Sequence, residues 1–383
     1  MKVLIAGDFC PQERISELID KGDYHQILSD IKPLLQDSDL SIVNLECPIV
    51  EREIEPIIKQ GPNLKCSSKA LEVLSDVGFN MVTLANNHIL DYGEEGIKNT
   101  IAVLESNDIL HVGAGDNLGK ASEIFYYNKN GEKLAIINCC ETEFSIATDS
   151  SAGANPLNPV SQWYKICEAK EKADYVIVIV HGGSEHCQLP SLRMQQTYRF
   201  FVDAGADVVV NHHQHCYSGY EIYNGKPIIY GLGNLCFDEA ISNGELWNNG
   251  FILKLVIDKG NICFACHPYV QCANVPRVIL ADESQEVHFR KKIGELNEVI
   301  KDKKKLESSL NTYYQNHDSS YKILLQPYTS RILLSLFYRG FLPDRLSKKK
   351  ALGYLNFIVC DSHRERLISY LKSRVFSTYG TKE

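Results

Sequence analysis

Through about residue 235 the sequence alternates short apolar runs with longer amphipathic stretches, and this alternation limits the chain to an α/β fold with buried strands. Each apolar run ends near Gly, Asn, Asp or His. We expect strands at residues 3–6, 40–44, 81–84, 134–138, 175–180, 208–210 and 228–230. We expect helices at residues 67–77, 93–106, 161–172 and 192–204.

The chain changes character after this region. Residues 250–258 and 262–269 are strand-like and are joined by Lys259-Gly260-Asn261, which predicts a hairpin. From Glu283 onward the sequence is helical and basic. We therefore expect a catalytic-type domain over residues 1–282 and a basic helical extension over residues 283–383.

The net charge of −8 is unevenly distributed. Residues 1–280 carry 21 Lys and Arg against 36 Asp and Glu, whereas residues 281–383 carry 19 against 12. An acidic body argues against nucleic acid as a partner. The basic region can face anionic lipid, an anionic polymer or the acidic body itself. Residues 328–342 mix apolar residues with Arg331 and Arg339, which is typical of a membrane-surface helix or of a stripe that packs on its own domain.

Cysteine usage and hydropathy predict the compartment. The 13 Cys are an odd number, and several, such as Cys139 and Cys140, lie in apolar runs that suit reduced thiols. The apolar run at the start is too short for a signal peptide, and no run reaches the roughly 18–20 residues of a membrane span. We expect a cytoplasmic protein, with peripheral membrane contact as an alternative.

Potential metal ligands follow several of the predicted strands. Asp8 follows the first strand, and Glu46 follows the second. The crevice beyond the carboxyl ends of the strands is the usual site of an open α/β sheet, so side chains from separate strands can meet there. Taken alone, Asp8 also fits a turn or a helix cap, and Glu46 fits a solvent-facing loop.

The run Asn86-Asn87-His88, with Asp91 and Gly93 after it, is the densest polar segment behind an apolar strand. The amide oxygen of Asn87 can bind a hard cation, and His88 can act as a general acid. An Asn-rich turn with an incidental His is the alternative.

Two later strands end in histidine. His181-Gly182-Gly183 is followed by Glu185, and Asn211-His212-His213-Gln214-His215 follows the strand at residues 208–210. His213 and His215 point the same way on an extended segment, and on a curved loop both can approach two metals. His212 then faces elsewhere and supports the other ligands. Asn234, in a glycine-rich segment, is a candidate contact to the cofactor.

Together these residues form a mixed oxygen and nitrogen ligand set that suits Mn, Fe or Zn better than Ca. Six ligands are too many for one catalytic zinc, so we expect two divalent transition metal ions. The candidate ligands are Asp8, Glu46, Asn87, His181, His213 and His215, and the candidate catalytic residues are His88, Asp91 and Glu185.

In order and spacing, these motifs resemble the CapA family of capsule and poly-γ-glutamate synthesis proteins over about residues 1–240. The resemblance implies a four-layer α/β/β/α sandwich of the calcineurin-like metallophosphoesterase type. It also implies that Asp8 and His215 hold one metal, that Asn87, His181 and His213 hold the other, that Glu46 bridges them, and that His88 is the catalytic imidazole. Such phosphoesterases commonly have His two residues after the first Asp, where this chain has Cys10.

The resemblance and the ligand set predict a metal-dependent hydrolase that acts on a phosphoester during surface-polymer synthesis. Two alternatives stay open. One is an enzyme that processes amide bonds of the polymer, and the other is a non-catalytic accessory subunit of a synthesis machine, which Cys10 motivates. The expected substrate is an anionic polymer or a phosphoester.

Overall fold

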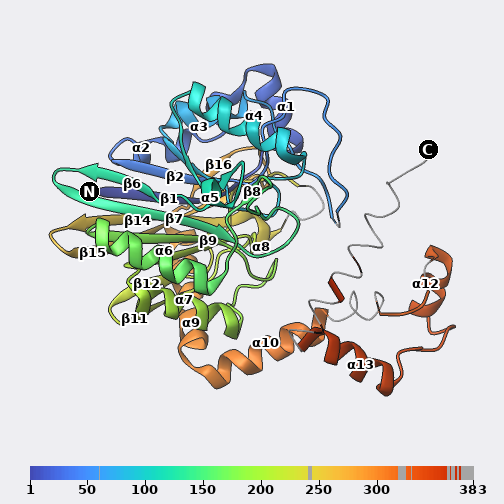
Figure 1. Ribbon diagram of the computed structural model, residues 1–383. Coiled ribbons are helices and arrows are strands. Elements are labelled where there is room, and N and C mark those ends of the chain that lie inside the picture. The colour runs from blue at the N-terminus through green and yellow to red at the C-terminus, as the bar shows by residue number, and fades with distance from the viewer. Residues whose placement is uncertain are drawn as a thin grey trace. The chain divides into compact units, whose positions relative to one another are not determined.

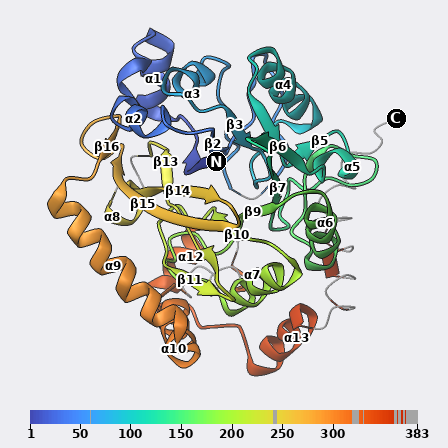
Figure 2. The ribbon, with the colours of Figure 1, turned by 90° about the vertical axis from the view of Figure 1, so that its left-hand side faces the viewer.

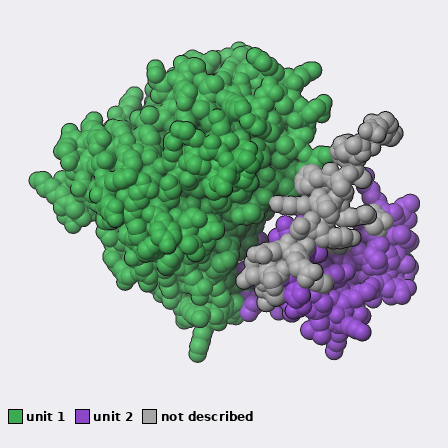
Figure 3. All heavy atoms as spheres, in the orientation of Figure 1, with its two compact units in different colours: residues 1–310 green, residues 311–383 purple. Residues whose placement is uncertain are grey.

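The computed structural model describes residues 1–59, 61–239, 244–317, 325–328, 330–359, 363, 367–368 and 371. The chain divides into two compact units, residues 1–310 and residues 311–383 (Figure 3). The predicted boundary at residue 283 coincides with the start of α9 (Glu283–Lys301). Because Phe289 and Ile293 of this helix pack in the core between the sheets, the first unit extends past that boundary.

Among the described residues, the first sheet contains eight strands in the order β16-β15-β14-β1-β2-β3-β4, with β13 paired to β1. Strands β1 to β4 and β13 run parallel, whereas β14, β15 and β16 form an antiparallel extension beside β1. The hairpin predicted around Gly260 is present as β14 and β15. The bounds are Lys2–Phe9 (β1), Leu40–Leu45 (β2), Met81–Thr83 (β3), Leu110–Val112 (β4), Asn234–Cys236 (β13), Asn249–Asp258 (β14), Asn261–Gln271 (β15) and Val278–Leu280 (β16).

The second sheet contains six described strands in the order β11-β12-β10-β9-β7-β6. Its four central strands are parallel, and β6 and β11 pair antiparallel at its edges. The bounds are Phe125–Lys129 (β6), Glu132–Cys140 (β7), Tyr175–His181 (β9), Val208–His212 (β10), Tyr220–Tyr223 (β11) and Lys226–Ile229 (β12). A separate ribbon pairs β5 (Ala114–Gly115) with β8 (Gly153–Ala154).

The two sheets pack face to face, and helices cover both outer faces (Figures 1 and 2). Along β1, Val3 and Ile5 point into the core between the sheets, and Leu4 points to the helices on the other face. This two-sided burial explains why the central strands are continuous apolar runs. The four-layer α/β/β/α arrangement confirms the predicted fold class.

The helices divide between the two outer faces of the sandwich (Figure 1). Those on the first sheet are α1 (Glu13–Lys21), α2 (Lys32–Leu35), α3 (Ala70–Val77) and α4 (Gly93–Ser106), with short 3₁₀ turns at Tyr24–Gln26 and Ser29–Ile31. Those on the second sheet are α6 (Pro159–Lys172) and α7 (Leu192–Ala204). Two further short helices are α5 (Leu118–Ala121) and α8 (Glu245–Asn248).

The predicted C-terminal helices are also present. After α9 the described helices are α10 (Lys303–His317), α12 (Arg331–Tyr338) and α13 (Lys348–Val359). None of the helices in the described part of the chain is long and apolar enough to cross a membrane. The end of the predicted extension, residues 372–383, lies outside the described residues.

Candidate metal centre

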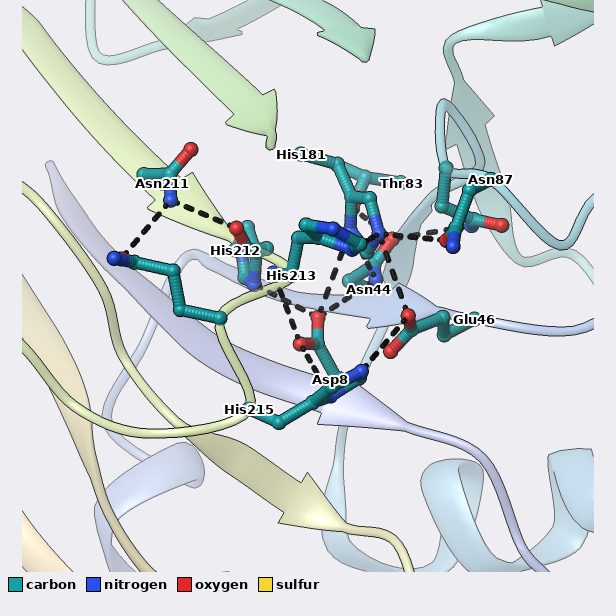
Figure 4. Close-up of polar contacts among 12 residues, drawn as sticks. Asp8, Asn44, Glu46, Thr83, Asn87, His181, Asn211, His212, His213 and His215 are labelled. Carbon is teal, nitrogen blue, oxygen red and sulfur yellow. Dashed lines mark hydrogen bonds and ion pairs between the residues drawn. The ribbon is translucent and has the colours of Figure 1, made fainter. Parts of the chain in front are cut away.

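The predicted ligands converge at the carboxyl ends of parallel strands from both sheets (Figure 4). Asp8 is near the end of β1, Glu46 follows β2, and His181 is the last residue of β9. All three side chains are almost completely buried. We name the group formed by Asp8, Glu46, His181, His213 and His215 the Asp8 cluster.

Gly7 brings the end of β1 close to the glycine-rich segment before β13. A Cβ atom on Gly7 would lie 1.8 Å from the carbonyl oxygen of Gly233, so no other residue fits without a backbone shift. The strand register also shifts around Asp8, whose backbone N–H donates to the Gly233 carbonyl at 3.3 Å. Asp8 therefore lies at a local irregularity of the strand that turns its carboxylate toward the second sheet.

The histidine-rich segment after β10 forms a tight turn. His213 and His215 have φ values of 87° and 55°, in the left-handed region that non-glycine residues rarely adopt. Of the two backbone paths considered from sequence, the curved one is therefore present. His212 stays in β10, and its Nδ1 lies 3.2 Å from Oδ1 of Asp8, where it supports a predicted ligand.

One half of the Asp8 cluster surrounds Nε2 of His181. This nitrogen lies 3.0 Å from Oδ1 of Asn87, 3.1 Å from Nδ1 of His213 and 3.3 Å from Oε1 of Glu46. Glu46, His181 and His213 form a group that could hold a metal ion, with ligand atoms within 4.8 Å of one another.

The other half of the cluster pairs Asp8 with His215. Nδ1 of His215 lies 3.7 Å from Oδ2 of Asp8, and its Nε2 lies 3.8 Å from Oε1 of Glu46. Asp8, Glu46 and His215 form a second group of the same kind, so Glu46 is common to both. A third, overlapping group joins the exposed Glu185 to His213 and His215.

These residues are consistent with a metal site, and Glu46 is common to two of the candidate ligand groups. The side chain of Glu46 is fully buried, and neither of its oxygens has a hydrogen-bond partner in the described residues. An isolated buried carboxylate is costly unless it is neutralised or bound to a cation. Ligands bound at about 2.0–2.2 Å lie roughly 3–3.6 Å from one another around a cation. The distances around His181 fall in this range, and those around His215 are slightly longer.

Burial lowers the pKa of His181 and of His213, which favours the neutral imidazole that binds metals. Burial and the neighbouring His213 lower the pKa of His181 well below its ordinary value. Burial and the Asp8 charge raise the pKa of Glu46 well above its ordinary value. Burial opposes ionisation of Asp8, but its contact with His212 and the charges of nearby histidines keep its pKa below the ordinary value. A cation that binds Glu46 therefore competes with a proton for its carboxyl group.

His88, Asp91 and Lys59 form a separate buried group beside the cluster. Nδ1 of His88 lies 2.7 Å from Oδ2 of Asp91 and 3.1 Å from Nζ of Lys59, and Lys59 also forms an ion pair with Asp91. Asp91 also accepts a hydrogen bond from the Leu64 backbone at 2.7 Å. Because Asp91 and Lys59 occupy the Nδ1 side of the ring, Nε2 is the nitrogen that can meet a ligand. Asp91, a candidate catalytic residue from sequence, thus contacts His88 and not the cluster.

Asn234 and Cys10 lie differently from what their sequence positions suggested. Oδ1 of Asn234 lies 2.9 Å from Nδ1 of His215, so this amide contacts a predicted ligand and orients its ring. Cys10 is fully buried, and its Sγ accepts a hydrogen bond from Gln12 at 3.4 Å. It belongs to none of the candidate metal groups found among the described residues.

Several supporting residues escaped the sequence-based site list. Asn44 donates to Oδ1 of Asp8 at 2.7 Å, and Asn211 donates to the Gly182 carbonyl at 2.8 Å, which ties β10 to the end of β9. Both amides stand at strand ends, which is a signal that sequence reasoning can use. Lys59 offered no such signal because it lies in an irregular segment.

Comparisons with known proteins agree with this arrangement. Residues 2–239 match the family described as "Bacterial capsule synthesis protein PGA_cap". The chain is 31% identical over 248 residues to the "Capsule biosynthesis protein CapA" of Bacillus anthracis, covering 63% of this chain and 60% of that protein. It is 31% identical over 237 residues to the "PGA biosynthesis protein CapA" of Bacillus subtilis strain 168, covering 61% and 62%. The chain thus spans about three fifths of the length of these relatives.

Among solved structures, the chain is similar to one titled a novel phosphatase from Mycoplasma pneumoniae. The TM-score is 0.46 and the sequence identity is 15%, with 76% of this chain and 98% of that chain covered.

Proposed function

The chain belongs to the PGA_cap family of bacterial capsule synthesis proteins, and from this premise we propose that it is a metal-dependent phosphoester hydrolase that acts in capsule or poly-γ-glutamate synthesis. The family membership confirms the resemblance drawn from the sequence motifs. The reaction and the substrate are our proposal.

The observation that carries the proposal is the bare carboxylate of Glu46. It is fully buried, neither oxygen has a hydrogen-bond partner within the described part of the chain, and it is shared by two groups of metal-ligand type. Structural polar groups in protein interiors are normally hydrogen-bonded. A carboxylate that meets two histidines from different strands without such bonds favours a bridging ligand between two cations.

The residues divide into those that bind and those that move a proton. Asp8 and His215 would hold one cation, Asn87, His181 and His213 would hold the other, and Glu46 would contact both. When bound, a pair of divalent transition metal ions, Mn, Fe or Zn, stabilises charge on a phosphoryl oxygen and lowers the pKa of an attacking water.

His88 supplies the proton transfer in this proposal. Its Nε2 faces the substrate side because Asp91 and Lys59 hold Nδ1. Protonated Nε2 would donate to the oxygen of the leaving group, which otherwise departs as an unfavourable alkoxide. Asp91 and Lys59 act as positioning residues that fix the ring.

A second candidate function is hydrolysis of amide bonds in the polymer. The name of the Bacillus subtilis relative refers to PGA biosynthesis, and the same ligand set would serve an amide carbonyl. The third candidate function is that of a non-catalytic accessory subunit of a polymer-synthesis machine. One experiment separates all three.

The experiment measures metal content and turnover of the full chain purified without a chelator. We expect about two transition metal ions per chain and metal-dependent hydrolysis of bis(p-nitrophenyl) phosphate. Protein that is shown to hold metal but hydrolyses neither a phosphodiester nor a phosphomonoester would overturn the proposal. Release of fragments from poly-γ-glutamate by that protein would establish the second candidate.

Matched variants complete this experiment. Glu46→Gln keeps the size of the side chain but removes the bridging charge, so it should lose both metal and turnover. Glu171→Gln, at an exposed position of α6, is the control. If the wild-type chain holds no transition metal and Glu46→Gln leaves its function in cells unchanged, the accessory role replaces the enzyme.

A further inference from the structure

The second unit exposes far more apolar surface than the first in proportion to its length. Of 24 exposed large apolar side chains in the described residues, twelve lie in residues 311–383, although that unit is much the shorter. Such a concentration of exposed apolar side chains indicates an interaction surface. The twelve are Tyr314, Leu325, Ile332, Leu333, Tyr338, Phe341, Leu352, Tyr354, Leu355, Ile358, Ile368 and Leu371.

Hydrogen bonds join the segment at residues 326–328 to the segment at residues 343–345. The side chain of Gln326 donates to Oδ1 of Asp344 at 2.8 Å and accepts from the backbone of Arg345 at 2.9 Å. Tyr328 donates to the Pro343 carbonyl at 2.7 Å. The two segments that flank α12 are therefore held together by hydrogen bonds.

Between these ends, α12 displays its apolar residues to solvent. None of the residues of α12 is buried, and Ile332 is 74% exposed. Phe341, just after the helix, is 72% exposed. Within the described residues, Phe337 packs against Tyr328, whereas Ile332 and Tyr338 on the same helix stay largely exposed.

The next helix combines an apolar row with a basic start. In α13, Leu352, Leu355 and Ile358 recur every three residues, which places them near one another on the helix surface, and all are more than half exposed. The helix begins with three exposed lysines, Lys348–Lys350. Basic residues beside an apolar row are typical of helices that lie in a membrane interface.

Charge decides which partner this surface fits. Residues 311–383 carry 12 Lys and Arg against 5 Asp and Glu. A second copy of the unit would present the same positive charge and would be repelled. The acidic first unit offers opposite charge, but it has only twelve exposed large apolar side chains over 310 residues. An anionic bilayer offers both an apolar interior and a negative surface.

We propose that residues 311–383 dock the protein on an anionic phospholipid bilayer. The apolar side chains of α12 and α13 enter the interface, and the lysines and arginines around them contact the lipid headgroups. This proposal does not depend on the hydrolase activity, because none of its residues belongs to the Asp8 cluster.

The test is co-sedimentation of the full chain with lipid vesicles. We expect binding to vesicles of phosphatidylcholine mixed with phosphatidylglycerol, little binding to pure phosphatidylcholine, and release by high salt. Failure to bind the anionic vesicles overturns the proposal. Self-association in place of binding, seen by analytical ultracentrifugation, assigns the surface to a second copy and also overturns it.

Two variants locate the surface. Lys348→Gln with Lys349→Gln and Lys350→Gln should weaken binding by roughly 100-fold, because each lysine near an anionic surface contributes about fivefold. The same three changes at Lys303, Lys304 and Lys305 in α10 are the charge-matched control and should have a much smaller effect. An equal loss in both variants would show non-specific attraction and overturn the assignment to this unit.

Ile332→Ser with Phe341→Ser tests the apolar contribution separately from charge. It should weaken binding by at least about tenfold, because two large side chains lose their burial in lipid. Ile222→Ser with Val160→Ser, at exposed positions of the first unit, is the matched control. If the variant with Ile332→Ser and Phe341→Ser binds vesicles as tightly as the wild type, α12 does not insert into the bilayer.

Discussion

The two units of the chain place their charged and apolar side chains in opposite ways. Residues 1–310 carry 28 Lys and Arg against 43 Asp and Glu, yet their central carboxylates, Asp8 and Glu46, are buried among histidines. Residues 311–383 are basic and present apolar side chains such as Ile332 and Phe341 to solvent. The first unit buries polar groups, and the second exposes apolar ones.

This difference indicates that substitutions in one unit can be made without changing the other unit. The Asp8 cluster is assembled from strands far apart in the chain, so its geometry depends on the packing of two whole sheets. The second unit relies on short helices and local bonds such as Gln326 to Asp344. Changes in one unit should therefore leave the property of the other unit intact.

The largest effect is expected from His88→Ala, which should lower kcat for a phosphoester by roughly 10²–10⁴-fold, because the proton donor is lost. Steady-state kinetics measure kcat of the variant, after its metal content is shown to equal that of the wild type. The loss should be smaller for a p-nitrophenyl leaving group than for an alkyl one, which needs the proton more. Vesicle binding should not change, and a variant that kept full turnover on an alkyl ester would remove His88 from the reaction.

A smaller loss is expected from Lys59→Met. The ring of His88 would keep its contact to Asp91 but lose the Lys59 ammonium that also contacts Nδ1. We therefore expect kcat to fall about 10–100-fold, as for other residues that orient a catalytic group. Lys59→Arg should restore part of the rate while metal content stays constant. Lys65→Met, an exposed lysine of the same segment, is the control. Equal rates in the two Met variants would leave Lys59 a purely structural role.

The stabilisation of the first unit by Mn should increase as pH rises above the ordinary pKa of a carboxyl group. Burial raises the pKa of Glu46, so without metal the folded form keeps a proton that contributes to stability at low pH and is lost as pH rises through the folded-state pKa. A cation replaces that proton, which adds about 1.4 kcal/mol per pH unit for each proton displaced. His181, whose pKa is lowered, stays neutral over this range. Thermal unfolding with and without Mn at several pH values measures the trend, and Glu46→Gln should flatten it.

The smallest effect on turnover is expected from a chain that ends after His317. The first unit keeps its core, including Phe289 and Ile293, so turnover of a small phosphoester should change by less than about twofold. Vesicle binding should disappear in the same sample. A tenfold fall in turnover with normal metal content and a normal circular dichroism spectrum would show that the units are not separable.

Much of the fold could be predicted because the central strands are buried on both faces. Their apolar runs are then visible without knowledge of their partners, as at residues 175–180. Short strands such as β13 and β16 were not expected, because each is only three residues long. The observed α4 and α7 start and end where the sequence placed them.

The site was predictable in its membership and less so in its geometry. Each ligand follows an apolar run, which is a local signal. That Glu46 contacts both His181 and His215 depends on the packing of two sheets and entered only through the family resemblance. Lys59 could not be found at all, because its position depends on the path of an irregular segment that Asp91 anchors.

The antiparallel extension of the first sheet bears on how fragments of this protein should be cut. The family match ends at residue 239, but β1, which carries Asp8, pairs along Lys2 to Ile5 with β14 at residues 253–256. A fragment that stopped at the match would expose the backbone of β1 as an open edge, where strands of other molecules can add and aggregate. Expression of the first unit alone should therefore retain the polypeptide through β16 and on to residue 310, well past the end of the family match.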